Sequence, residues 1–498
     1  TNSKETADMK RWPKYVNQYL KKKGLPTDIA LTFEDVTIVD RFSEITSRSD
    51  AFIDTGSDLG KGIRLPRPIF SANMDTITES EMAIAMARLG GCGVIHQFLS
   101  IEKRAREVEK VKRADSHVVE SPLTIRKSDS IGAAKELIKE HRVSGLIVVE
   151  DDSEKVVGIF SGRDARWAPD NIKIHERLTP LDKMIFARDG IALEDAKKIL
   201  YETRLEKLPI LDEKGMLAGL ITASDILKRE RFRFAFRDQK GRLGVAAAVG
   251  VGKNALSECE ALLKAEADII FVDTARGNSA VLQKTVKEIR RAFGDGLLLS
   301  AGNVDTPDAI KMLYDAGADL PKEGIGGGSL CKTRKGPGIG MPKITSSASS
   351  AAVARIYKKA FISDGGIKGP DDFCKNLATG ANAIMIGGLF GATDETPGPV
   401  IFEDGERWKM VRGSASAEFQ MSRTDRGPEN GRLRAPEGIL KRERYRGEVT
   451  PVFDELTAYL HSSMSYVGAK NLKEFHQKSY FSRQTASGYE EGKPHDVY

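Results

Sequence analysis

The sequence predicts an α/β protein built on a (β/α)8 TIM barrel that is interrupted by an insert. Short apolar runs rich in β-forming residues alternate with helix-like stretches, a pattern typical of a parallel sheet. Eight such runs can be counted, which is the number of strands in this barrel. The alternation breaks off between residues 96 and 245, a gap too long for one strand–helix unit. We therefore expect one inserted domain between two parts of the barrel.

The eight predicted strands differ in quality. Seven are apolar, whereas the run that begins at Leu320 contains Pro321 and two charged residues. It is included because a barrel needs eight strands and because a glycine-rich loop follows it. Helices are expected between most strands, for example over 80–89, 256–265, 280–293, 307–316 and 370–377. The predicted strands are Ile69–Met74, Gly93–His96, Val245–Val249, Ile269–Asp273, Leu297–Ala301, Leu320–Gly324, Phe361–Asp364 and Ala383–Ile386.

The predicted insert contains an internal repeat. One copy runs from His141 to Asp164 and the other from Thr203 to Asp225. Ser161 and Thr222 lie 61 residues apart, and each precedes an aspartate by three positions. A repeat of this length predicts a small unit that pairs with its copy. We expect the barrel over 1–112 and 231–498, the insert over 113–230 with halves of about 115–174 and 175–230, and connectors over 104–113 and 228–237.

Composition narrows the function classes. Apolar residues make up 40% and charged residues 30% of the chain, as in an ordinary globular protein. The excess of 77 basic over 71 acidic residues is small and scattered, which argues against a nucleic-acid partner. No run approaches the ~18 apolar residues of a membrane helix. The polar, lysine-rich residues 1–23 also lack the apolar core of a signal peptide.

The four cysteines are spread over the 498 residues without a disulfide or metal-binding spacing, so a reducing cytoplasm is expected. Cys92, Cys259 and Cys374 lie in apolar or helical settings and are expected to be structural. Cys331 differs, because it lies in a polar, glycine-rich and basic loop. That setting predicts a nucleophile that can move toward a bound substrate.

The loop that contains Cys331 is built for close contact with a ligand. Four of the five residues 324–328 are glycine, which lets the backbone approach a bound group. Ser329 adds a hydroxyl suited to a phosphate. Two further glycine pairs, 365–366 and 387–388, end the seventh and eighth predicted strands, where barrels commonly bind phosphate through backbone N–H groups. Asp364 can accept hydrogen bonds from both ribose hydroxyls. A cradle for a nucleoside monophosphate is predicted.

Together these motifs resemble the IMP dehydrogenase and GMP reductase family over nearly the whole chain. The resemblance is carried by the 324–334 loop, by 363–367, by Leu31–Val36 and by Ser71–Thr76. The insert resembles tandem CBS domains, in which a Ser/Thr-x-x-Asp motif meets the ribose and phosphate of an adenine nucleotide. The same motif is also a helix cap. On the resemblance, Ser161, Asp164, Thr222 and Asp225 would contact an adenine or guanine nucleotide.

The resemblance implies the committed step of guanine nucleotide synthesis. Cys331 would attack C2 of IMP, a hydride would pass to NAD, and hydrolysis of the adduct would release XMP. Thr333 would assist this chemistry. By the same resemblance Asp273, Asn303 and Gly324 would bind NAD, Asp364 the ribose, and Ser329, Gly365, Gly366, Gly387 and Gly388 the phosphate, with Ser71, Met74, Gly413 and Glu437 around the base.

A flap over Arg412–Pro436 would supply the arginine that activates water, and Arg426 occupies the matching position. It is followed by glycine where the dehydrogenases usually have tyrosine, and Val411–Ser416 also departs from the usual pattern, so Arg423 and Arg432 are alternatives. The tail would complete a potassium site between subunits, which implies a homotetramer or an octamer. A disordered tail is the alternative. The implied potassium ligands are Gly326, Gly328 and Cys331 of one subunit with Glu491, Gly492 and Lys493 of another.

Two other functions compete. A GMP reductase would share the fold and the cysteine but use NADPH and release ammonia. The insert and the His495–Val497 tail favour the dehydrogenase, whereas Ser463–Ala469 and the missing tyrosine lean toward the reductase. A non-catalytic adenylate sensor would have a damaged cysteine loop, but Cys331, Thr333 and Asp364 are all present.

Overall fold

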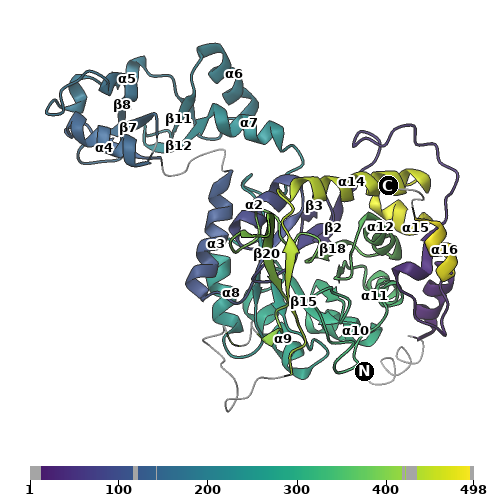
Figure 1. The fold of residues 1–498 in the computed structure, drawn as a ribbon. Coiled ribbons are helices and arrows are strands. Elements are labelled where there is room, and N and C mark those ends of the chain that lie inside the picture. The colour runs from purple at the N-terminus through teal and green to yellow at the C-terminus, as the bar shows by residue number, and fades with distance from the viewer. Residues whose placement is uncertain (1–12, 116–121, 142, 418–420, 422–434, 494–498) are drawn as a thin grey trace. The chain divides into compact units, whose positions relative to one another are not determined.

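The structure is a computed structural model that describes residues 13–115, 122–141, 143–417, 421 and 435–493. The chain divides into two compact units (Figure 1). The first unit combines the chain up to Ala114 with the chain from Phe234 onward. The second is formed by the intervening residues, Asp115–Arg233.

The first unit is a closed barrel of parallel strands, which confirms the predicted fold class. The weak run at Leu320 is one of its strands, and the first strand ends at Ser71 rather than Met74. Around the barrel, the strand order within the described residues is β13-β14-β15-β16-β17-β18-β4-β5. Their bounds are β4 Ile69–Ser71, β5 Cys92–Ile95, β13 Ala246–Val249, β14 Ile269–Asp273, β15 Leu298–Val304, β16 Leu320–Glu323, β17 Ile362–Asp364 and β18 Ala383–Ile386.

The charged residues of β16 can lie in a buried strand because each has partners inside the protein. All of its residues from Leu320 to Glu323 are buried. Lys322 forms ion pairs with Asp273 and Asp364. Glu323 is paired with Lys343. Buried charges are tolerated when they are paired and hydrogen-bonded in this way.

Helices surround the barrel (Figure 1). Those predicted at 80–89, 280–293 and 307–316 are confirmed with the same bounds, and the other two shift by one or two residues. The expectation that 104–113 is a connector is wrong, because this stretch belongs to a barrel helix whose Lys112 pairs with Asp238 and Asp268. The helices are α2 Ser80–Leu89, α3 Ile101–Ala114, α8 Ala255–Lys264, α9 Ala280–Phe293, α10 Pro307–Ala316, α11 Lys343–Tyr357, α12 Pro370–Thr379, α14 Thr450–Tyr466, α15 Leu472–Lys478 and α16 Ala486–Glu491.

Two apolar layers hold this unit together. One fills the barrel, where Phe70 and Phe271 meet edge to face with ring centroids 5.5 Å apart. The other lies between the strands and the surrounding helices. Two small sheets flank the barrel, formed by β1 (Val36–Ile38) with β22 (Phe481–Arg483) and by β2 (Ser57–Gly60) with β3 (Ile63–Leu65).

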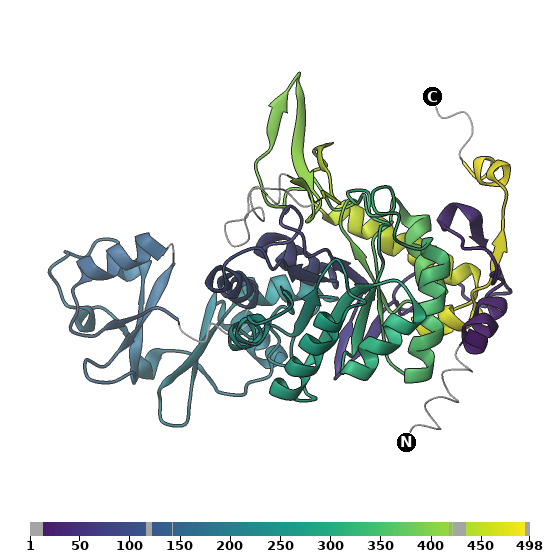
Figure 2. The same cartoon turned by 90° about the horizontal axis from the view of Figure 1, so that it is seen from below.

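A third, antiparallel sheet follows the last barrel strand and projects from the barrel (Figure 2). It consists of β19 (Ile401–Glu403), β20 (Glu406–Arg412) and β21 (Leu440–Arg444). Because Arg412 pairs with Leu440 across β20 and β21, the two ends of the chain segment between them are brought together. The segment predicted as a flap therefore begins and ends next to the paired ends of β20 and β21.

The second unit consists of two halves with the same order of elements: strand, helix, two antiparallel strands and helix. The halves pack through an apolar cluster to which both contribute, including Val149 and Leu211. Their elements are β6 Thr124–Arg126, α4 Ile131–His141, β7 Gly145–Val149, β8 Val156–Ser161, α5 Gly162–Ala165 and β9 Thr179–Pro180, followed by β10 Ala187–Arg188, α6 Leu193–Thr203, β11 Lys207–Leu211, β12 Leu217–Thr222 and α7 Ala223–Arg231.

Candidate active site

Cys331 is the accessible cysteine of this chain. All four cysteines lie among the described residues, and Cys331 is exposed while the others are buried. Burial raises the pKa of Cys259 and of Cys374 to about 12, and it raises the pKa of Cys92 well above its usual value. The three buried thiols are therefore unreactive at neutral pH, as expected from their apolar settings.

The sulfur of Cys331 is linked to a carboxylate through a hydroxyl. Its Sγ lies 3.1 Å from Oγ1 of Thr333, and that hydroxyl donates a hydrogen bond of 2.7 Å to Oε2 of Glu437. The backbone holds the two segments together, since Cys331 forms a β-bridge with Gly438 and Leu330 accepts a hydrogen bond from the N–H of Ile439. Because the hydroxyl proton of Thr333 is directed to Glu437, Thr333 presents a lone pair toward the sulfur.

The glycine pair that ends β18 allows two side chains to approach the backbone. A Cβ on Gly388 would lie 2.5 Å from Oγ of Ser329, and a Cβ on Gly387 would lie 3.3 Å from Sδ of Met74. A side chain at Gly388 would displace the serine. The structure thus brings Ser329, Met74 and this glycine pair together.

The glycine pair that ends β17 lies against the cysteine loop. Gly365 and Gly366 have φ values of +82° and +85°, a backbone conformation that favours glycine. A Cβ on Gly365 would lie 3.5 Å from the nitrogen of Gly328, and a Cβ on Gly366 would lie 3.5 Å from the oxygen of Gly327. Both predicted glycine pairs therefore border the loop that contains Cys331.

Lys322 lies between two of the predicted ligand-binding carboxylates. Its Nζ is 2.8 Å from Oδ1 of Asp273 and 3.2 Å from Oδ2 of Asp364. Burial alone would lower the pKa of Lys322, but the two carboxylates raise it above its usual value, so the lysine is charged. Asn303 completes the group, since its Nδ2 donates to Oδ2 of Asp364 at 2.7 Å and to the oxygen of Gly324 at 2.8 Å.

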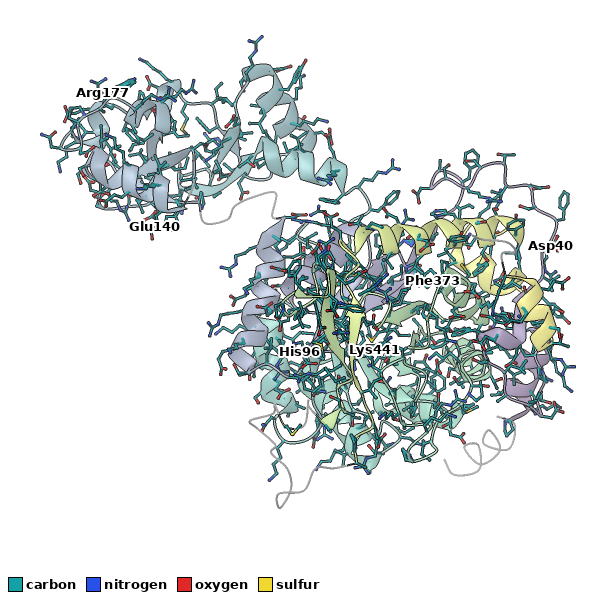
Figure 3. All side chains as sticks on the ribbon, viewed as in Figure 1. Asp40, His96, Glu140, Arg177, Phe373 and Lys441 are labelled. Atoms are coloured by element: carbon teal, nitrogen blue, oxygen red, sulfur yellow. The ribbon has the colours of Figure 1, made fainter. Side chains whose placement is uncertain are left out.

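Lys322 and the side chains that follow β5 are functional candidates that the sequence motifs do not indicate. Gln97 donates to Oδ2 of Asp273 at 3.2 Å. His96, labelled in Figure 3, is buried, and its Nε2 lies 3.3 Å from Oε1 of Glu79. Two features of the sequence could have indicated these residues: Lys322 is a lysine within a buried strand, and His96 and Gln97 are polar residues directly after a strand.

The remaining predicted base-binding residues lie close to the same loop or behind it. The N–H of Gly413 donates to the oxygen of Ile439 at 2.9 Å, and a Cβ on Gly413 would lie 2.6 Å from the oxygen of Leu330. Ser71 is buried, and its Oγ accepts a hydrogen bond of 2.9 Å from Thr78.

Arg412 begins the predicted flap and pairs with Asp75, with 2.8 Å between Nε and Oδ2. Arg423, Arg426 and Arg432 lie outside the described residues.

The predicted cation-binding groups lie in two separate segments of the chain. In the cysteine loop, the oxygen of Gly328 accepts a hydrogen bond of 3.0 Å from the N–H of Cys331, which leaves one lone pair. Near the other end, α16 includes Glu491 and packs against the short helix at Phe33–Asp35. No grouping of three or more His, Cys, Asp or Glu side chains among the described residues could hold a metal ion. Backbone carbonyls, by contrast, are the donors that suit potassium.

In the second unit the Ser-x-x-Asp motif caps a helix. The backbone N–H and the hydroxyl of Ser161 donate to Oδ2 of Asp164 at 2.8 and 2.6 Å. Thr222 is the last residue of β12, and the side chain of Asp225 lies outside what the structure describes. The first motif thus acts as a helix cap in the structure.

None of the helices within the described residues is long and apolar enough to cross a membrane.

The fold and this arrangement define a class of protein, a (β/α)8-barrel enzyme with an accessible cysteine beside glycine turns and paired carboxylates. Residues 30–495 match the family described as the IMP dehydrogenase / GMP reductase domain. The chain belongs to this family and is an oxidoreductase.

Relatives with established names extend over most of the chain. The inosine-5'-monophosphate dehydrogenase of Aquifex aeolicus is 41% identical over 472 residues, which cover 94% of this chain and 95% of the relative. That of Nitrosopumilus maritimus is 40% identical over 475 residues, 94% of this chain and 98% of the relative.

Solved structures of a second enzyme of the family are also similar. A cysteine-to-alanine variant of the GMP reductase of Trypanosoma brucei, in complex with guanosine 5'-monophosphate, is 35% identical with a TM-score of 0.85. It covers 96% of this chain and 100% of its own. The same reductase in complex with guanosine 5'-triphosphate is 32% identical with a TM-score of 0.75, covering 93% and 99%.

Proposed function

We propose that this enzyme oxidises IMP to XMP with NAD through a covalent adduct on Cys331. The observation that carries the proposal is the chain of contacts from the exposed sulfur of Cys331 through Thr333 to Glu437, beside the two glycine pairs. One ligand can therefore contact a nucleophile (Cys331), a proton acceptor (Glu437) and the glycine turns that can bind a phosphate.

The substrate is held by groups with distinct chemistry. Ser329 and the backbone N–H groups of 365–366 and 387–388 bind the phosphate, for which such turns are suited. Asp364 accepts hydrogen bonds from the ribose hydroxyls, and its partners Lys322 and Asn303 fix its orientation. Ser71, Met74, Gly413 and Glu437 surround the base.

The chemistry then proceeds in two steps. The thiolate of Cys331 adds to C2 of the purine, and the hydride leaves C2 for NAD, which supplies the oxidising nicotinamide when bound beside Asp273, Asn303 and Gly324. Water next attacks C2, the carbon–sulfur bond breaks, and XMP leaves while the thiol is restored. One NADH and one proton are formed for each water consumed. Thr333 accepts the proton of the attacking water and passes its own proton to Glu437.

Arg426 in the flap is proposed to orient this water, with Arg423 and Arg432 as alternatives. A potassium ion held by the carbonyls of Gly326, Gly328 and Cys331, together with Glu491, Gly492 and Lys493 of a neighbouring copy, is proposed to support the cysteine loop within a homotetramer or octamer. The second unit is proposed to be a tandem CBS pair that binds adenine or guanine nucleotides through Ser161, Asp164, Thr222 and Asp225.

GMP reduction is the second candidate. It is favoured by the similarity to solved GMP reductase structures. The inserted unit does not separate the candidates, because the Trypanosoma brucei reductase aligns with 96% of this chain, which includes most of residues 115–233. The relatives at 40–41% identity, which are named dehydrogenases, support the first candidate.

A paired assay tests the proposal. The enzyme is incubated with IMP and NAD in potassium buffer, and in parallel with GMP and NADPH, while the nicotinamide absorbance is followed. We expect NADH to form only in the first mixture, with XMP as the product. Consumption of NADPH with release of ammonia in the second mixture, and no reaction in the first, would show a reductase instead.

A further inference from the structure

A second group of buried charges lies directly behind the proposed nucleotide cradle. It consists of Glu323 at the end of β16, Lys343 at the start of α11 and Asp305 after β15, which are 0%, 5% and 6% exposed. None of the proposed catalytic steps uses these residues. Three ionisable side chains in such a position carry a desolvation cost, so their contacts call for an explanation.

Lys343 joins the ends of two barrel strands. Its Nζ donates to Oε2 and to the backbone oxygen of Glu323 at 3.0 and 3.2 Å, and to the backbone oxygen of Asp364 at 2.6 Å. These bonds use all three protons of the ammonium group. The space between the strand ends is full, since a Cβ on Gly324 would lie 2.5 Å from Nζ of Lys343 and 2.2 Å from the oxygen of Asp364.

The needs of the helix do not account for a lysine at this position. Lys343 is the first residue of α11, and the partial positive charge of a helix N-terminus disfavours a cation there. Nor does the ion pair account for it, because a buried pair is often no more stable than apolar side chains of the same volume. What the lysine provides, and an apolar side chain could not, is a donor to the carbonyl of Asp364.

The carboxylate of Glu323 keeps Lys343 in place, and Asp305 extends the group to the chain that follows the cysteine loop. The carboxylate of Glu323 also accepts hydrogen bonds from the hydroxyls of Ser346 and Ser363, the latter at 2.7 Å. Asp305 accepts the N–H of Met341 through Oδ2, where the chain returns from the cysteine loop to α11. Its Oδ1 is buried and has no hydrogen-bond partner among the described residues.

We propose that Lys343, oriented by Glu323, is a positioning residue that sets the place of Asp364 and of the glycine pair after it, and thereby the affinity for the nucleotide. The identity of that nucleotide rests on the proposed function. Lys343 itself touches no ligand in this proposal; it acts through the carbonyl of Asp364 and through Gly324.

The test separates folding from positioning by means of two variants. Lys343→Met alone leaves the buried Glu323 without its cation, and we expect it to lower both the stability and the affinity for IMP. In the double variant, Glu323→Gln with Lys343→Met, the ion pair is removed as a whole and Glu323 no longer leaves a carboxylate without its cation, so stability should recover toward that of the parent. The carbonyl of Asp364 still lacks its donor, and we expect the dissociation constant for IMP to remain raised about tenfold, as for one lost hydrogen bond of a charged group.

Lys23→Met is the matched control. Lys23 is 3% exposed, and its Nζ also donates to backbone oxygens, those of Ala378 and His476, at 2.6 and 2.7 Å. These residues lie outside the candidate site. We expect this variant to lose stability without any change in IMP affinity, which is measured by calorimetry on the full chain without NAD. In turnover, the Lys343 variants should raise the KM for IMP more than they lower kcat.

The outcomes distinguish this proposal from the proposed function. Binding of IMP by the double variant at parental affinity would overturn the positioning role, and so would an equal loss of affinity in Lys23→Met. If the parent binds GMP and not IMP, the proposed function fails, but the same variants titrated with GMP still decide the role of Lys343, because ribose and phosphate are common to both nucleotides.

Discussion

The hydroxyl of Thr333 donates a hydrogen bond of 2.7 Å to Oε2 of Glu437, which lies 104 residues further along the chain. This bond fixes the direction of the hydroxyl proton and leaves a lone pair free on the side that faces Cys331. A water that approaches beside the sulfur and donates to this hydroxyl can therefore lose its proton to Thr333 as the threonine proton moves to Glu437. The two residues form a path by which a proton can leave the site.

Thr333→Val should interrupt this path while nearly preserving the side-chain volume. We expect IMP to bind normally and the adduct on Cys331 to form, while turnover falls at least about a hundredfold because water is no longer deprotonated. Rapid-quench measurement of NADH would show a burst equal to the enzyme concentration, followed by a slow steady state. Thr37→Val in the exposed part of β1 serves as the control. A parental steady-state rate in Thr333→Val would remove Thr333 from the hydrolytic step.

Cys331→Ala should abolish NADH formation and leave the dissociation constant for IMP within a factor of about two, because the phosphate and ribose contacts remain. Alkylation offers a second readout on the parent. The exposed Cys331 should react first, since the other thiols are buried, and bound IMP should protect it. Formation of NADH by Cys331→Ala at the parental rate would exclude covalent catalysis by this residue.

Some parts of the fold and site could be predicted from the sequence because their signals are local. Seven of the eight strands followed from apolar runs, and the glycine pairs followed from their place at strand ends. The helix α11 was not predicted, because its serine- and alanine-rich sequence has no apolar period. The charge-rich stretch within α3 has the composition of a connector, because the sequence does not show that Asp238 and Asp268 pair with Lys112.

The contacts that organise the site depend on residues distant in sequence. The bond between Thr333 and Glu437 requires the residues just before β21 to lie against the cysteine loop, and no local pattern predicts this register. In the sequence, Lys322 is only an unexpected charged residue within a predicted strand. Its two carboxylate partners come from β14 and β17, so its role became clear once the barrel had closed.

Gly388→Ala should weaken nucleotide binding through a steric effect. The added Cβ would lie 2.5 Å from Oγ of Ser329, so the serine must move away from the phosphate position. We expect the KM for IMP to rise about tenfold or more with a smaller change in the KM for NAD. Gly296→Ala is the control, because nothing lies within 4 Å of its added Cβ. Similar KM values for IMP in both variants would argue against a phosphate site at Gly388.

Arg426→Ala addresses the flap, which is assigned from the sequence. If Arg426 orients the water, hydride transfer should persist while hydrolysis slows, and the adduct should accumulate and be detected as added mass on the peptide that contains Cys331. Arg423→Ala and Arg432→Ala are parallel variants on the same segment. The arginine whose loss causes accumulation is the one that acts on water, and unchanged turnover in Arg426→Ala would transfer the role to one of the other two.

Asp305→Asn should alter how stability depends on pH. Burial, and next the charge of the adjacent Glu323, raise the pKa of Asp305 to about 7, whereas an unfolded aspartate titrates near about 4. Between these values the folded chain keeps a proton that the unfolded chain has released, so this group's contribution to stability falls as the pH rises from about 4 to about 7 and is constant above that.

Asparagine can still accept the N–H of Met341 but cannot titrate. The free energy of unfolding of Asp305→Asn, measured in urea, should therefore gain on that of the parent as the pH rises through this window and then level off. Asp372, whose pKa burial raises to about 6, and Lys23, whose pKa burial lowers to about 7, titrate in both proteins and cancel in the difference. A difference that stays constant from about pH 4 to about pH 8 would mean that Asp305 is ionised throughout, with Lys343 balancing both carboxylates.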